Sequence, residues 1–442
     1  MKNKNRRNFL IKSLAGFTLA IIPKKVFSSS EPEIIVIGAG AAGLAATEHL
    51  IKNGKSVLCI EASNRIGGRA ITDNKIFSEP YDLGALWIEN GETNPFKIYG
   101  VNQGSFNLYK ERSEEMYAVY NGTKKTSQED ELWKIYDGIE ASIAKNKKKD
   151  IAPIDIVPFQ DERWFNTAHM LVGPWEMGKD FYNYSCKDFG YDYGVQESGV
   201  WHCSEGFGTL VNSMYQNVPV QLNTKVKEID WSGPGVKIET NKGTLKSQKC
   251  IITVSTGVLG SGQIKFTPNL SEDKQESFSK ISMGHYNRIA FKFKKLFKKS
   301  SKDFYLYYKV NDKSNNSPKG MGITIKPSDS NLCICDPGGN FALELAKEGN
   351  DASIDFALNE LKKIFGNKIQ KDLIQSHVAD WSTNENFLGA WASAEPGAFE
   401  YRGILKQSVG DRLYFAGEAT AADWGTVAGA AQSGINTAQK LI

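Results

Sequence analysis

The sequence has few cysteines, no metal-ligand spacing and no long apolar run. Its 442 residues include six cysteines, and their positions do not have the spacing of a metal site. The sequence therefore predicts no metal site and no disulfide framework, although a single bridge stays open. Cys59 and Cys250 lie in apolar, strand-like runs and are expected to be buried. No run reaches the roughly 18 apolar residues that a membrane-spanning helix needs.

An excess of basic charge is also missing once the N-terminus is set aside. The formal net charge is +4, but residues 1–30 hold seven Lys and Arg side chains and no acid, so the rest of the chain carries −3. The lysine-rich stretches at residues 145–149 and 294–302 are therefore interpreted as solvated faces. A nucleic-acid partner is not expected.

The N-terminus resembles an export signal. Arg6 and Arg7 precede an apolar run over residues 13–22, and two lysines and a serine cluster follow. Paired arginines are typical of a twin-arginine signal, which directs a folded bacterial protein out of the cytoplasm. We expect the twin-arginine translocase to export the protein to the periplasm or another extracytoplasmic location, with residues 26–28 as the best cleavage site. A disordered basic tail and a membrane anchor stay open as alternatives.

The first folded segment has the pattern of a parallel α/β sheet. With 40% hydrophobic and 24% charged residues, the chain can bury a large core and is expected to form two domains. A strand over residues 33–37, a glycine turn, a helix over 41–52 and a strand over 56–60 make one βαβ half-unit.

The later segments have a different pattern. Residues 91–200 lose the α/β alternation, and helices are expected over 131–144 and 161–171. Short strands over 218–252 predict an antiparallel meander. A strand over 412–415 leads through a glycine-acid turn into a C-terminal helix of small residues.

The glycine turn carries a dinucleotide-binding fingerprint. Residues 38–43 read GAGAAG, with glycines where the strand turns tightly, where backbone approaches a pyrophosphate and where helix packs on strand. The helix N-terminus then faces the phosphates. Glu61 lies 18 positions beyond Gly43, where an acid takes a pair of ribose hydroxyls. Without this context the motif would only indicate a glycine-rich turn.

The residues after this acid distinguish FAD from NAD. Residues 67–69, Gly-Gly-Arg, provide flexible backbone and a guanidinium for the second phosphate. At this point the chain resembles the flavin-containing amine oxidase family, which includes monoamine oxidases, polyamine oxidases and histone lysine demethylases. The resemblance continues in order through residues 82–89 (DLGALWIE), 205–211 (EGFGTLV), 222–226 (LNTKV), 253–268, 415–420 (FAGEAT) and 429–434 (GAAQSG).

The resemblance implies an α/β fold of the glutathione-reductase type. A Rossmann-like FAD-binding domain is interleaved with an α+β substrate-binding domain in such proteins. The FAD-binding domain is expected to comprise residues 31–90, 201–265 and 381–442, and the substrate-binding domain residues 91–200 and 266–380, after the export signal at residues 1–30.

The resemblance also implies a cofactor site for non-covalent FAD. Monoamine oxidases bind flavin through a cysteine where this chain has Ala390, so no covalent bond is expected. The residues assigned to the cofactor are Gly38, Gly40, Ala41, Ala42, Gly43, Glu61, Ala62, Gly68, Arg69, Gly84, Ala85, Leu86, Trp87, Val226, Trp381, Gly417, Glu418, Thr426 and Val427.

An aromatic cage is implied in front of the flavin. Trp391 matches one of the two rings that flank the substrate amine and tolerate its transient positive charge through their π faces. The second cage position is Thr426, with Trp424 nearby, so the cage is incomplete or rebuilt. A tryptophan of the protein core is the alternative interpretation of Trp391.

Three further residues bear on the chemistry. Arg288 stands where most members have a lysine that bridges through water to the reactive flavin nitrogen, and its alternative is an ion pair. Glu89 matches an acid of plant-type polyamine oxidases that suits a cationic substrate group, or else it forms a buried salt bridge. Trp87 stands where amino-acid oxidases place a carboxylate-binding arginine, so amines are favoured over amino acids.

The predicted function is flavin-dependent amine oxidation. A hydride leaves the carbon next to nitrogen for the flavin, and the imine hydrolyses to an aldehyde or ketone. The expected partners are a small amine and either O2 or a redox carrier as electron acceptor, and a homodimer stays open. Two alternatives remain: an L-amino-acid oxidase or tryptophan 2-monooxygenase-like enzyme, and a flavin-binding protein without catalysis, which the departures at Arg288 and Thr426 would support.

Overall fold

The computed structural model describes residues 31–111, 115–120, 123–124, 126–192, 199–294, 304–311, 316–325 and 330–442. The expected twin-arginine segment, residues 1–30, lies outside this set, as does nearly all of the lysine-rich stretch 294–302. Pro32–Ile442 folds into one compact unit.

A five-stranded parallel sheet begins the fold. Its central strands are buried along their whole length because other elements cover both faces, which favours runs of Ile and Val. The strands are, in order across the sheet, β22 (Leu413–Phe415), β13 (Lys249–Ile252), β1 (Ile34–Ile37), β2 (Val57–Ile60) and β9 (Val220–Gln221).

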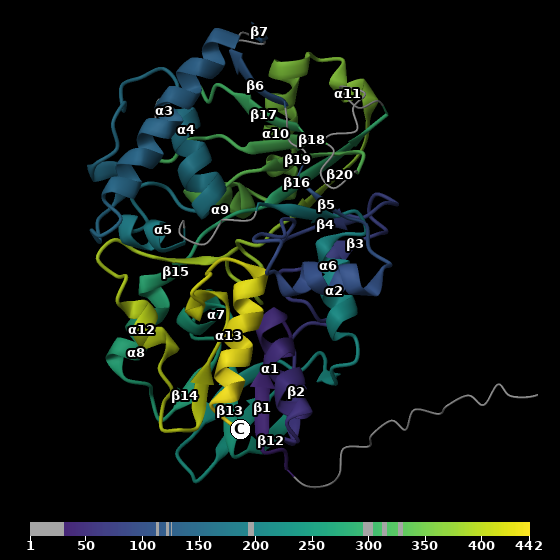
Figure 1. Ribbon diagram of the computed structural model, residues 1–442, viewed down its shortest axis with the longest axis vertical. Helices are drawn as coiled ribbons and strands as arrows, with labels where there is room; N and C mark the ends of the chain where they lie inside the picture. The colour runs from purple at the N-terminus through teal and green to yellow at the C-terminus, as the bar shows by residue number, and fades with distance from the viewer. Residues whose placement is uncertain are drawn as a thin grey trace, which may run out of the picture. The chain divides into compact units, whose positions relative to one another are not determined.

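Two helices from opposite ends of the chain pack side by side on this sheet. α1 (Ala41–Lys52) follows the glycine turn, and α13 (Val427–Gln439) is the last helix of the chain (Figure 1). Their approach depends on small residues, since a Cβ atom on Gly434 would lie 2.1 Å from the carbonyl oxygen of Ala42. The first and last segments of the chain therefore build one side of the sheet together.

The predicted meander over residues 218–252 is only partly right. β10 (Val226–Asp230), β11 (Val236–Thr240) and β12 (Gly243–Ser247) do form an antiparallel ribbon, which β14 (Lys265–Thr267) joins in parallel to β10. β9 and β13 instead belong to the parallel sheet. The apolar run of β13 has no alternation, which is typical of a strand covered on both faces.

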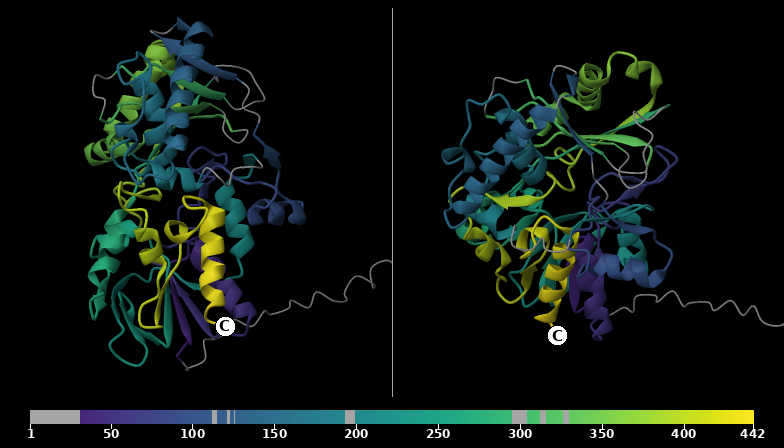
Figure 2. Two further views of the ribbon diagram at one scale, coloured as in Figure 1. Left: turned by 60° about the vertical axis from the view of Figure 1, so that its left-hand side comes forward. Right: turned by 45° about the horizontal axis from the view of Figure 1, so that its top comes forward.

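A second sheet of seven strands lies in the other part of the unit. Helix α3 (Thr126–Lys145) packs against β6, and α10 (Asn350–Phe365) packs against β16 and β20 (Figure 2). The strands are, in order, β20 (Leu373–Ala379), β16 (Arg288–Phe293), β19 (Leu332–Asp336), β18 (Gly322–Ile325), β17 (Phe304–Tyr308), β6 (Glu115–Tyr120) and β7 (Thr123–Lys124).

The remaining elements are further helices and the strands of three two-stranded sheets, β3–β4, β5–β8 and β15–β21. The helices are α2 (Pro95–Gln103), α4 (Phe165–Met170), α5 (Cys186–Asp192), α6 (Phe207–Tyr215), α7 (Thr256–Gly260), α8 (Glu272–Lys280), α9 (Gly339–Glu348), α11 (Ile369–Asp372) and α12 (Tyr401–Lys406), with a 3-10 turn η4 (Glu418–Thr420). The short strands are β3 (Thr72–Asp73), β4 (Tyr81–Asp82), β5 (Leu108–Lys110), β8 (Trp201–Cys203), β15 (Ile281–Met283) and β21 (Ala392–Ala394).

Two predicted helices have different bounds in the structure. α3 begins at Thr126, five residues before the predicted start at residue 131. The helix predicted over 161–171 begins at Phe165, and after Met170 it widens into a π-helical turn that contains Pro174. Pro174 lacks the backbone N–H that would bond the carbonyl oxygen of Met170 in an α-helix, so the regular helix ends at Met170.

The predicted α/β fold class is confirmed, with a Rossmann-like parallel sheet beside a mixed second sheet. Strands of the parallel sheet lie between residues 34 and 415 and those of the second sheet between 115 and 379, so the chain passes back and forth between the two. The residue boundaries of the two domains stay a prediction. All six cysteines are buried and unbridged, and no helix of the described residues is long and apolar enough to cross a membrane.

Candidate active site

One large cavity of about 660 Å³ collects the predicted site. This volume is within the range of small-molecule and cofactor sites. Every residue that was assigned to the cofactor or to the amine borders it, except Gly43. A Cβ atom on Gly43 would lie 1.9 Å from the carbonyl oxygen of Gly38. Gly43 therefore packs closely between helix and turn, as expected of the third glycine of the motif, and its assignment to the cofactor stays a prediction.

The phosphate end of the cavity is built from two glycine turns. Gly38 turns the chain out of β1 with a φ of 101°, and Gly40 begins α1 without a side-chain cap, so the helix N-terminus is available to an anion. Gly68, at a φ of 60°, lies so close that a Cβ atom there would be 3.1 Å from the Cα of Gly40. The two turns together form a cradle of bare backbone.

Glu61 is fixed at the end of β2 beside this cradle. Its Oε2 accepts a hydrogen bond from the backbone N–H of Ala39 at 2.7 Å, and its Oε1 accepts one from the N–H of Ser63 at 2.8 Å. These bonds fix the carboxylate at the cavity, which Val226 also borders. A ribose between the two residues fits this arrangement.

Arg69 and Glu418 form an ion pair between the first and last cofactor motifs. The Nη1 of Arg69 lies 3.1 Å from Glu418 Oε1 and also donates to the carbonyl oxygen of Ala390. Glu418 in turn accepts a bond from the N–H of Ala392 at 3.3 Å. The guanidinium that was expected at the second phosphate therefore also fixes the backbone on either side of Trp391.

Thr426 acts as a helix cap. Its Oγ1 accepts the N–H of Gly429 at 2.8 Å and donates to the carbonyl oxygen of Asp423 at 2.9 Å. The N-terminus of α13 therefore begins at the cavity next to Gly417, whose φ of 142° is in the range that favours glycine. The bare glycine turns, two helix N-termini and Glu61 fit a flavin dinucleotide.

Of the two predicted cage positions, Trp391 carries a ring and Thr426 does not. Trp391 is half-buried, and Tyr286 supports it with ring centroids 5.1 Å apart. Gly425 lies beside it, since a Cβ atom there would be 3.5 Å from Trp391 Cδ1. Trp424 borders the cavity but is only 2% exposed and belongs to the core. The second wall of the predicted cage is therefore backbone and a capping threonine.

Arg288 is held in a buried ion pair at the edge of the cavity. Its Nε donates to Asp336 Oδ1 at 3.0 Å, and its Nη1 donates to the carbonyl oxygens of Asp82 and Gly84 at 2.7 and 2.8 Å. Burial acts to lower the pKa of Arg288, but the Asp336 carboxylate raises it above the ordinary value. Of the two interpretations of this arginine, the structure shows the ion pair.

The substrate end of the cavity is acidic and aromatic. Glu111 accepts a hydrogen bond on Oε1 from the Tyr305 hydroxyl, and His202 Nε2 lies 3.5 Å from the same atom. Burial acts to raise the pKa of Glu111, but the bonds from His202 and Tyr305 lower it below the usual range. Trp87 donates to the Tyr305 hydroxyl at 3.1 Å. Glu111 is therefore a carboxylate that stays ionised.

Sequence reasoning missed most of this end. The additional bordering residues are Tyr136, Trp175, Glu176, Phe189, Tyr286, Tyr305 and Tyr307. They come from separate segments, and a signal existed only for those between residues 91 and 200, where aromatic residues are frequent. Glu89, which was predicted, borders the same end.

Comparisons with known proteins agree with this geometry. A model of the family "Flavin containing amine oxidoreductase" matches residues 159–442, and one of the NAD(P)-binding Rossmann-like domain matches residues 36–99. Polyamine oxidase 4 of Oryza sativa subsp. japonica is 26% identical over 93% of this chain and 89% of that protein.

Two solved structures show the same fold. Cyclohexylamine oxidase from Brevibacterium oxydans has a TM-score of 0.72 at 20% identity, over 93% of this chain and 99% of that one. Wild-type putrescine oxidase bound to putrescine has a TM-score of 0.70 at 18% identity, over the same shares. Because the family model covers more than half of the sequence, the chain belongs to the flavin-containing amine oxidoreductase family.

Proposed function

We propose that this enzyme oxidises an aliphatic amine that carries a second cationic group, such as a diamine or polyamine. The observation that carries the proposal is that one cavity is bordered by the dinucleotide cradle, by Trp391 and by Glu111, whose pKa is lowered. A substrate with two amines suits it, since one nitrogen must lose its proton before oxidation and the other can keep its charge.

The chemistry divides between cofactor and protein. FAD, when bound, supplies the acceptor for a hydride from the carbon next to the amine nitrogen. The chain contributes the orientation of that carbon, with Trp391 as the ring beside the reacting nitrogen. The imine that results hydrolyses in water to a carbonyl compound, with release of ammonia from a primary amine or of the shorter amine from a secondary one.

Amino acids suit the cavity less well than amines. Recognition of a carboxylate would call for a guanidinium that is not already paired. The arginines among the described cavity residues are Arg69 and Arg288, and each is engaged by a carboxylate, Glu418 or Asp336. Trp87 occupies the position where a carboxylate-binding arginine would stand.

The acidic end favours a second ammonium group. Tyr305 and His202 both contact Oε1 of Glu111, and a second ammonium group is expected to bind the other carboxylate oxygen, Oε2. The rings of Trp87, Trp175 and Tyr305 pack edge to face next to it and can cover an alkyl chain. The names polyamine oxidase and putrescine oxidase, borne by similar proteins, agree with this substrate class.

The test compares two substrates with the same carbon chain, butylamine, which has one amine, and 1,4-diaminobutane, which has two. In Glu111→Gln, the KM for the diamine should rise about tenfold or more because a charged partner is lost, whereas the KM for butylamine should stay within about twofold. Glu400→Gln, at a side chain that is 81% exposed, is the control. An equal effect on both substrates would contradict the role of Glu111, and a flavin that neither amine reduces would contradict the proposed activity.

A further inference from the structure

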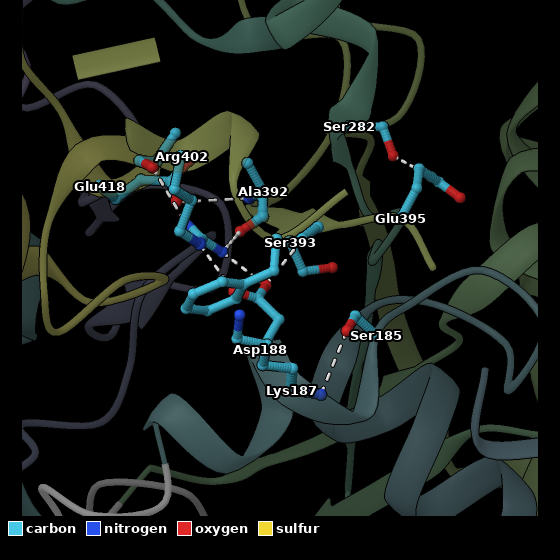
Figure 3. Close-up of polar contacts among 12 residues, drawn as sticks. Ser185, Lys187, Asp188, Ser282, Ala392, Ser393, Glu395, Arg402 and Glu418 are labelled. Atoms are coloured by element: carbon cyan, nitrogen blue, oxygen red, sulfur yellow. Dashed lines mark hydrogen bonds and ion pairs between the residues drawn. The ribbon is translucent and has the colours of Figure 1, made fainter. Parts of the chain in front are cut away.

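Arg402 and Asp188 form another buried ion pair beside the segment that carries Trp391. Arg402 on α12 binds Asp188 on α5 in bidentate geometry, with Nε to Oδ1 and Nη2 to Oδ2 both at 2.6 Å (Figure 3). The side chains are 9% and 0% exposed. Two parallel charge-assisted bonds fix the plane of the guanidinium as well as its position.

The remaining donors of Arg402 reach the backbone of the active site. Its Nη1 donates to the carbonyl oxygen of Ala419 at 2.8 Å, next to Glu418, and its Nη2 donates to that of Ala392 at 3.4 Å, next to Trp391 (Figure 3). Asp188 Oδ2 also accepts the N–H of Ala394 at 2.7 Å. The ion pair therefore fixes the position of β21 relative to η4.

The same guanidinium also supports Trp424. Its carbon lies 4.8 Å from the centroid of the Trp424 ring. The indole N–H of Trp424 has no hydrogen-bond acceptor in the described part of the chain. The stacked cation is therefore the polar contact that orients this ring at the cavity wall.

The segment around Trp391 is thus fixed by two ion pairs. Arg69 binds the carbonyl oxygen of Ala390, and its partner Glu418 accepts the N–H of Ala392. Arg402 binds the carbonyl oxygen of Ala392, and its partner Asp188 accepts the N–H of Ala394 on the same strand. We infer that Asp188 and Arg402 are positioning residues for amine oxidation, which set the placement of Trp391 and Trp424 against the flavin. This inference rests on the proposed function, because it assigns the pair a part in that reaction.

The test is Arg402→Lys, which keeps the positive charge but removes the guanidinium group that binds Asp188 through two parallel hydrogen bonds. Anaerobic reduction of bound FAD by saturating diamine should slow about tenfold or more, because small displacements of orienting groups are costly in rate. The KM for the diamine should stay within about twofold, since the Glu111 end is intact. In the double variant with Trp391→Phe, the Arg402→Lys substitution should slow FAD reduction by less than a further factor of about two relative to Trp391→Phe alone.

The matched control is Arg412→Lys. Arg412 lies 5.5 Å from the ring centroid of Trp231 and donates to the carbonyl oxygens of Gly410 and Gly233, but neither Arg412 nor Trp231 borders the cavity. The FAD bound to this variant should be reduced by diamine at the wild-type rate. A reduction rate per bound FAD in Arg402→Lys within about twofold of wild type, or an equal loss in the control, would overturn the inference.

A second variant covers the case in which Arg402→Lys does not fold. Asp188→Leu with Arg402→Met replaces the pair by apolar groups, which buried ion pairs often tolerate. The FAD bound to this double variant should also be reduced slowly by diamine. Reduction at the wild-type rate would overturn the inference. If no amine reduces wild-type FAD, the proposed function fails by itself. Visible circular dichroism of bound FAD then decides, because Arg402→Lys should change the spectrum and an unchanged spectrum would overturn the inference.

Discussion

The Nε atom of Arg288 lies 3.0 Å from Oδ1 of Asp336, and both side chains are almost completely buried. Tyr286 donates its hydroxyl to the other carboxylate oxygen at 2.9 Å. Since Tyr286 supports Trp391 and Arg288 binds the carbonyl oxygen of Gly84, this pair connects the wall around the amine with a segment at the cofactor.

Asp336→Asn should destabilise the protein strongly. The substitution leaves the guanidinium of Arg288 buried without its counter-charge, which is expected to lower the free energy of unfolding by roughly 3–5 kcal/mol. Denaturant titration of the variant and wild type measures this difference. Glu400→Gln, which removes the exposed partner of Lys187, should cost less than about 1 kcal/mol. Similar decreases in the free energy of unfolding of both variants would show that the buried ion pair stabilises the protein no more than the exposed one.

Asp180 should make stability fall as pH rises through weakly acidic values. Burial raises the pKa of Asp180 to about 6, while the unfolded value is near 4. Between these values the folded state binds more protons than the unfolded state, so the free energy of unfolding falls with rising pH, by up to about 3 kcal/mol.

The variant Asp180→Asn isolates this effect. Its amide oxygen can still accept the N–H of Asn340, which now bonds Oδ2 at 2.9 Å. The free energy of unfolding of wild type minus that of the variant should decline from about pH 4 to about pH 6 and stay level above that. A difference that does not change with pH would contradict the raised pKa.

FAD should leave the protein on denaturation. Ala390 has no nucleophilic side chain, and its carbonyl oxygen is bound by Arg69. After precipitation with acid, the yellow colour is expected in the supernatant, with a chromatographic mobility identical to that of free FAD. Colour that stays with the pellet would reveal a covalent bond elsewhere.

We propose that Arg6 and Arg7 direct export of the folded holoprotein. Substituting both by lysine should leave FAD-loaded protein in the cytoplasm, because the twin-arginine route depends on the arginine pair and not on charge alone. Cell fractionation with a flavin assay measures the distribution, and Lys24→Arg is the control. Undiminished export of the double variant would remove the basis of this assignment.

The cofactor end was predictable because its constraints are local in sequence. Gly38, Gly40 and Gly68 are required by turns and by close backbone approach, and such requirements leave a readable spacing. The capping role of Thr426 also had a signal, since a threonine directly precedes the small-residue helix. The resemblance to a cage position obscured that simpler interpretation.

The substrate end was not predictable for a physical reason. Glu111 and Tyr305 meet although they are 194 positions apart, and Arg288 meets Asp336 across neighbouring strands β16 and β19. Each residue alone is compatible with an exposed or a buried position. The register of β16 and β19 brings Arg288 to Asp336, whereas Glu111 follows β5 outside the second sheet, and no motif records either contact.

Anaerobic reduction of the purified holoprotein tests the central claim most directly. Diamines should bleach the flavin absorbance without oxygen, and the rate at a fixed subsaturating concentration should rise with pH as more of the amine loses its proton. A panel of mono-, poly- and cyclic amines ranks the substrates. A flavin that dithionite bleaches but that no amine reduces at any pH would contradict the account.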